Sequence, residues 1–133
     1  AWETEDLTRE YANSAIRDLD GTALRAFANQ RGPDAPVFTW FYAPWCKQCK
    51  LIRPAVEEAA QESGDIAYAK LDCVADVDAK NFYGVTSYPS FKVLRGSRHR
   101  WVEIPRNRTT QVIAELAASE AQGPFVWAHS LAE

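Results

Sequence analysis

Short apolar runs alternate with amphipathic stretches along most of the chain. The run Val37–Tyr42 is apolar or aromatic almost throughout, yet it is too short for a buried helix. We therefore expect a central strand that is covered on both faces. The run Ile66–Cys73 predicts a second buried strand. The other expected strands are Ala15–Leu19, at an edge of the sheet, and a hairpin of Ser90–Leu94 and Arg100–Ile104 around Arg95-Gly96-Ser97.

Helical patterns fill the intervals between these strands. Asp20 can cap a first helix, Asp76–Tyr83 predicts a third, and Thr109 or Thr110 can cap a fourth. The alternation of strands and helices, with a hairpin before the last helix, predicts an α/β fold. We expect a central mixed sheet with helices on both faces. A second helix should follow Cys46, with one apolar side formed by Leu51, Ile52, Ala55, Val56, Ala59 and Ala60.

The length of 133 residues fits one domain. We expect an N-terminal extension at 1–14, the folded domain at 15–121, and a tail at 122–133 that packs on the domain or on a neighbour. Residues 2–12 are polar and weakly periodic, which suggests a helix. Fifteen Lys and Arg against 18 Asp and Glu argue against nucleic acid or an anionic membrane as the main partner. No apolar run reaches 18 residues, so no membrane span is predicted.

A pair of cysteines, Cys46-Lys47-Gln48-Cys49, lies between a predicted strand and a predicted helix. Unpaired N–H groups and the helix dipole favour a thiolate at the helix start, so we expect a lowered pKa for Cys46. Only a thiolate attacks a disulfide, which makes Cys46 the expected attacking sulfur. Cys49 lies one turn further on and can resolve the mixed disulfide. Lys47 adds positive charge beside the thiolate.

Two other interpretations of the pair are open from the residues alone. Two cysteines at this spacing form half of a zinc site, but zinc needs about four ligands, and the histidines His99 and His129 stand alone. A purely structural disulfide is the second alternative. The third cysteine, Cys73, ends a buried strand and is expected to be a free thiol packed as a small apolar side chain.

Several motifs of one known family occur along the chain in the family's order. They are Phe41–Lys50, Pro54, Tyr83-Gly84-Val85 and Tyr88-Pro89-Ser90-Phe91. Together they resemble the thioredoxin superfamily, and most of all a catalytic (a-type) domain of the protein disulfide isomerases. The resemblance implies a thioredoxin fold in which Cys46 is the nucleophile and Cys49 the resolving thiol. It also implies a cis Pro89 facing the cysteine pair, and an apolar rim for client peptides formed by Trp45 and Tyr88.

Two residues depart from the family pattern. Gln48 stands where the isomerases commonly have His and the thioredoxins Pro, which leaves the direction of electron flow open. Trp40 stands where the family usually has a buried acid that moves the proton of the resolving thiol. The family's lysine partner of that acid matches Lys70. We hypothesise that buried Lys70 has a lowered pKa and takes over some proton transfer; the alternative is that its amine extends to water.

Arg108 precedes the last helix, where isomerase domains carry an arginine that can swing toward the cysteine pair. A guanidinium near Cys49 would favour its thiolate. The alternative is a surface arginine beside Arg106.

The resemblance implies a thiol–disulfide oxidoreductase of the secretory pathway, in the lumen of the endoplasmic reticulum. It forms, reduces or rearranges disulfides in unfolded or disulfide-containing proteins, and exchanges electrons with glutathione or a partner oxidoreductase. No cofactor is expected, since the electrons reside in the redox-active Cys46–Cys49 disulfide. Two alternatives remain: a thioredoxin-like protein disulfide reductant, and a peptide-binding or chaperone module whose thiols are incidental.

Overall fold

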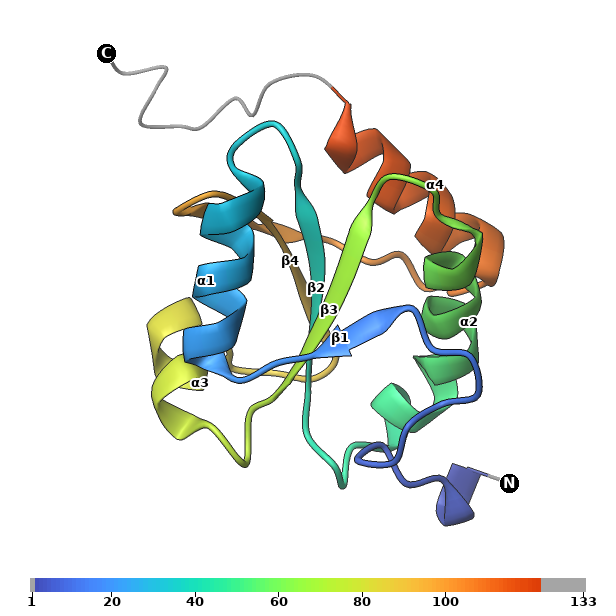
Figure 1. Ribbon diagram of the computed structural model, residues 1–133. Helices are drawn as coiled ribbons and strands as arrows, with labels where there is room; N and C mark the ends of the chain where they lie inside the picture. The colour runs from blue at the N-terminus through green and yellow to red at the C-terminus, as the bar shows by residue number, and fades with distance from the viewer. Residues whose placement is uncertain (1, 123–133) are drawn as a thin grey trace.

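A five-stranded mixed sheet forms the centre of the computed structural model, which describes residues 2–122 (Figure 1). In sheet order the strands are β1 (Ile16–Asp18), β3 (Ala67–Asp72), β2 (Val37–Tyr42), β4 (Ser90–Arg95) and β5 (Arg98–Val102). Parallel pairing joins β3 to both β1 and β2, and antiparallel pairing joins β4 to both β2 and β5. The predicted α/β architecture is therefore confirmed.

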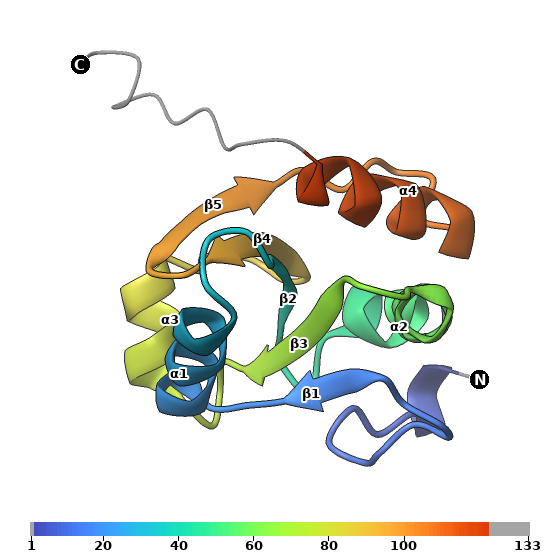
Figure 2. The ribbon, with the colours of Figure 1, turned by 45° about the horizontal axis from the view of Figure 1, so that its top comes forward.

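Two helices cover each face of the sheet, as Figure 2 shows. Helices α1 (Gly21–Arg31) and α3 (Val77–Tyr83) lie on one face. Helices α2 (Lys47–Glu62) and α4 (Thr110–Ala121) pack together on the other.

Every residue of β2 is buried, which confirms a central strand covered on both faces. Alternate side chains therefore enter two separate apolar clusters. Val37 and Phe41 pack in the cluster with residues of α1 and α3. Phe38, Trp40 and Tyr42 pack with residues of α2 and α4, in the cluster that also holds both cysteines of the pair.

Side-chain caps fix where the helices begin. Asp20 accepts a hydrogen bond from the backbone N–H of Ala23, and Asp76 and Thr109 cap α3 and α4 in the same way. The cap predicted at Asp20 is therefore confirmed, and of the two candidates Thr109 and Thr110 it is Thr109 that caps α4. Gly84 ends α3 in the left-handed conformation, with a φ of 73°.

The predicted hairpin is present, but its second strand lies earlier than expected, at 98–102 instead of 100–104. Arg95 pairs with Arg98, so only Gly96 and Ser97 form the turn. Gly96 has a φ of 58°, which a tight hairpin turn requires and glycine adopts without strain.

The helix expected at residues 2–12 is wrong apart from a short 3-10 helix at Trp2–Thr4. The rest of this segment forms turns, because side chains of the domain take up its carbonyl oxygens. Arg53 donates to the carbonyls of Asp6 and Arg9, and Gln61 donates to two carbonyls further along the segment. The expected packing of the tail at 122–133 falls, beyond residue 122, outside the described residues.

Candidate active site

Cys46 is the N-cap of α2, at the end of the connection from β2. Its sulfur accepts a hydrogen bond from the backbone N–H of Cys49, with 3.1 Å between Sγ and N. The predicted placement of Cys46 at a helix start is therefore confirmed. Unpaired N–H groups at this position favour negative charge on the sulfur.

Both cysteines are buried, but not to the same extent. Cys46 keeps 5% of its surface exposed, whereas Cys49 has none. Burial, and then the hydrogen bond with Cys46, raises the pKa of the Cys49 thiol. Cys49 therefore rests as a thiol and must lose its proton before it can attack. The side chains between them, Lys47 and Gln48, are exposed.

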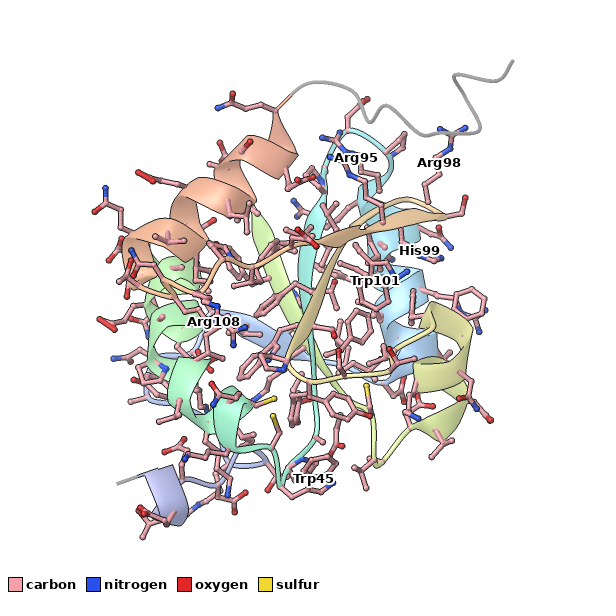
Figure 3. The ribbon with its side chains drawn as sticks, turned by 180° about the vertical axis from the view of Figure 1, so that it is seen from behind. Trp45, Arg95, Arg98, His99, Trp101 and Arg108 are labelled. Carbon is pink, nitrogen blue, oxygen red and sulfur yellow. The ribbon has the colours of Figure 1, made fainter. Side chains whose placement is uncertain are left out.

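The Tyr88–Pro89 peptide bond is cis, as the resemblance implies. The Tyr88 ring meets the Trp45 ring edge to face, with 5.7 Å between the centroids. Trp45 is 68% exposed and lies where α2 begins (Figure 3). Tyr88 also lies close enough to Cys49 for the charges of the two groups to interact. The two aromatic rings therefore form an apolar surface beside the cysteine pair.

The third cysteine, Cys73, is a buried free thiol. Burial raises its pKa to about 12, so Cys73 stays protonated. Its Sγ donates to the carbonyl of Leu71, at 3.9 Å. Within residues 2–122, no group of three or more potential ligands is placed to hold a metal ion.

Arg108 lies on the α2 side of the sheet (Figure 3). It lines a cavity of about 370 Å³ together with Pro89 and Trp101. Its Nε donates to the carbonyl of Pro105, at 3.4 Å. The structure thus brings Arg108 near the cis-proline loop. The residue is half-exposed.

Lys70 is buried opposite Trp40, its pairing partner on β2. Its Nζ donates to the carbonyl of Leu7, at 3.2 Å, so the amine binds the N-terminal segment instead of extending to water. Burial, and then the nearby charge of Arg53, lowers the pKa of Lys70. This direction agrees with the expectation from the sequence.

A cluster of buried charge around Lys70 was not predicted from the sequence. Arg53 and Glu57 lie one turn apart on α2, almost fully buried, with 3.7 Å between Nε and Oε2. Arg53 also pairs with Glu5, and Glu57 accepts a hydrogen bond from Ser14. The four-residue spacing of Arg53 and Glu57 is enough to predict an ion pair within one helix. It does not predict that residues 5–14 bury this pair.

Lys70 should make the stability of the domain depend on pH. In the folded protein its pKa is lower than in the unfolded chain, so the unfolded chain binds more protons as the pH approaches 10.5. The free energy of unfolding of the wild type should therefore increase relative to Lys70→Met as the pH rises toward 10.5. Urea unfolding of both proteins at several pH values measures this difference. A difference that stays constant would contradict the predicted shift.

Comparison with known proteins agrees with this geometry. A family model described as thioredoxin matches residues 18–118. The chain belongs to the thioredoxin family. Its α/β fold and its cysteine pair are therefore those of a thiol–disulfide oxidoreductase family, as the sequence indicated.

The curated relatives of this thioredoxin-family chain are protein disulfide isomerases. One from Aspergillus niger is 39% identical over 85 residues, which is 62% of this chain and 16% of the relative. One from Arthroderma benhamiae is 48% identical over 62 residues, which is 45% of this chain and 12% of the relative. The chain thus spans less than a fifth of the length of either relative.

Solved structures share the fold. The first thioredoxin domain of mouse protein disulfide-isomerase A4 has a TM-score of 0.72 at 22% identity, covering 94% of this chain and 87% of that one. The J-Trx1 fragment of ERdj5 has a TM-score of 0.73 at 23% identity, covering 85% of this chain and 53% of the fragment. Across residues 2–122, no helix has the length and apolar character needed to cross a membrane.

Proposed function

We propose that this chain is a catalytic domain that forms, reduces or rearranges disulfides in protein substrates through Cys46 and Cys49. The observation that carries the proposal is the asymmetry of the pair: Cys46 caps the helix start and keeps 5% of its surface exposed, whereas Cys49, one turn deeper, has none. Cys46 attacks a client disulfide and forms a mixed disulfide. Cys49 then attacks Cys46 and releases the client, so the electrons pass between the client and the pair without a cofactor.

The side chains around the pair support this reaction. Trp45 and Tyr88 offer apolar surface to an unfolded client, next to the backbone of the cis Pro89. Lys47 adds positive charge beside Cys46. Arg108 lines a cavity together with the cis Pro89, and its proposed role is to swing toward the Cys49 thiolate as it develops.

The proposed setting is the secretory pathway, with the lumen of the endoplasmic reticulum as the compartment. The protein disulfide isomerases among the curated relatives support it. Unfolded or disulfide-containing proteins are the proposed substrates, and glutathione or a second oxidoreductase is the proposed electron partner.

A glutathione redox titration of the Cys46–Cys49 pair, combined with assays on a scrambled test protein, tests this function. We expect a potential nearer to the isomerase range, roughly −180 mV, than to the thioredoxin range, roughly −270 mV. A value near the thioredoxin range would favour a protein disulfide reductant. If a Cys46→Ala/Cys49→Ala variant retained the full cellular role, the chain would instead be a peptide-binding module.

Gln48 should tune the potential of the pair. Gln48→His places an imidazole on the exposed first turn of α2, where its positive charge stabilises the reduced thiolate. We expect the potential to rise by about 30 mV, which corresponds to about 1.4 kcal/mol for two electrons. Gln30→His, an exposed position on α1 on the opposite face of the sheet, is the matched control. An equal potential for wild type and Gln48→His would exclude this role.

A further inference from the structure

The indole of Trp40 is buried beside the cysteine pair. Only 1% of the residue is exposed, and it packs in the same cluster as Cys46 and Cys49. Its ring stacks on Phe91, with 6.4 Å between centroids, and tilts against Tyr42 at 5.5 Å. These contacts hold the indole in one position on the α2 side of the sheet.

The indole nitrogen, Nε1, makes no hydrogen bond of ordinary geometry to any of the described residues. A buried N–H without an acceptor destabilises the state in which it is left unpaired. This N–H nevertheless lies near enough to the Cys49 sulfur to act on it as a donor, and this lowers the pKa of the Cys49 thiol. Burial raises the same pKa and has the larger effect. Trp40 is therefore a donor without a strong acceptor while Cys49 is a thiol.

Burial aside, the largest effects on the Cys49 sulfur come from Cys46, the backbone of Ala43 and the indole of Trp40. The amine of Lys70 is bound to the carbonyl of Leu7. Among these groups, the Trp40 indole is the side-chain donor that lowers the pKa of Cys49, so it can respond when the charge of Cys49 changes.

We propose that the Trp40 indole N–H donates a hydrogen bond to the Cys49 thiolate and so promotes the resolving step. This inference rests on the proposed function. Cys49 first loses its proton to water, and the thiolate gains the indole N–H as a donor. The Cys49 thiolate then attacks Cys46 Sγ. A Cys46–Cys49 bond forms, the bond between Cys46 and the client sulfur breaks, and the client leaves with the electron pair as a thiolate that takes up a proton.

The Trp40 N–H promotes the resolving step because it stabilises the Cys49 thiolate more strongly than the Cys49 thiol. A thiol sulfur accepts a hydrogen bond weakly, whereas a thiolate accepts one strongly. The indole N–H is left without a strong partner in the resting state and gains one as the reacting charge develops. Stabilisation that is stronger at the charged sulfur than in the resting state increases the rate of attack. An indole cannot accept the proton, so Trp40 assists as a donor and not as a base.

The test follows resolution of the glutathione adduct in the full chain. Reduced protein is mixed with excess glutathione disulfide, quenched with acid at successive times, and the adduct is counted by mass spectrometry at several pH values. We expect Trp40→Phe to slow resolution about tenfold near neutral pH, and to raise the midpoint of its pH profile by about one unit. Phe38→Leu, which loses aromatic packing in the same cluster, is the matched control and should keep the wild-type midpoint.

A second measurement uses the wild type alone, so it does not depend on how well a variant folds. Alkylation of Cys46 with iodoacetamide removes its charge, as the mixed disulfide does, and leaves Cys49 free. In this protein the ¹⁵N-indole resonance of Trp40 should shift with pH at the midpoint of the resolving step. A Trp40 resonance that does not titrate, or an unchanged midpoint in Trp40→Phe, would overturn the inference. If the wild type formed no adduct on Cys46 at all, the proposed function itself would fail.

Discussion

Cys49→Ala is expected to accumulate a stable mixed disulfide on Cys46. In Cys46→Ala the rate of disulfide exchange should fall more than about a thousandfold. The reason is the different position of the two cysteines. Cys46 caps the helix start and keeps 5% of its surface exposed, so we expect it to attack a client without Cys49. Cys49 is fully buried, and burial raises the pKa of its thiol, so it cannot replace Cys46 as the attacking group. Incubation with glutathione disulfide, followed by mass spectrometry of peptides, identifies the modified cysteine.

The third cysteine supplies the control for this experiment. Cys73 is buried, and its pKa is raised to about 12 by burial, so it should neither form the adduct nor contribute to the rate. Cys73→Ala is therefore expected to exchange disulfides like the wild type. An adduct found on Cys49, or full activity in Cys46→Ala, would contradict the assigned order of attack.

The parts of this fold that follow from local pattern could be predicted from the sequence. The apolar run Val37–Tyr42 predicts the central strand, and Asp20 and Thr109 predict two helix starts, because each signal lies within a few residues of its effect. The position of Cys46 as an N-cap follows for the same reason. The roles around the pair came from the resemblance to the isomerases, since no spacing in the sequence links residue 46 to residue 88.

The N-terminal segment could not be predicted in this way. Its carbonyl oxygens bind Arg53 and Gln61, which lie more than 40 residues away in the sequence. The side chain of Leu7 is buried in the core cluster that holds the cysteine pair. Such contacts leave no periodic pattern in residues 2–12, and the weak pattern present there suggested a helix instead.

The N-terminal segment also provides a partner for Lys70, which lies opposite Trp40. Lys70 keeps its place opposite residue 40 on the neighbouring strand, but with Trp40 it has no carboxylate there as a partner. Its amine instead binds the backbone of Leu7, and the nearby carboxylates are Glu5, Asp18 and Glu57. The N-terminal segment thus provides buried Lys70 with the polar contact that a charged amine requires.

Arg53→Ala is expected to destabilise the domain by about 3–5 kcal/mol, the range found when one partner of a buried ion pair is removed. For a chain of this length the melting temperature should fall by roughly 10–15 °C. The substitution leaves Glu57 buried without its cation, and it removes the donors to the carbonyls of Asp6 and Arg9. Hydrogen exchange of residues 5–13 should accelerate as well. Thermal unfolding and hydrogen–deuterium exchange measure the two effects.

The damage from Arg53→Ala should come from the unpaired charge of Glu57 as well as from lost contacts. Adding Glu57→Gln to Arg53→Ala removes that charge, so the double variant should be less destabilised than the sum of the two single variants. Arg106→Ala, an exposed arginine, is the matched control and should change the free energy of unfolding by less than about 0.5 kcal/mol. Strict additivity would mean that Arg53 and Glu57 do not interact. Unchanged exchange at residues 5–13 would mean that Arg53 does not hold the N-terminal segment on α2.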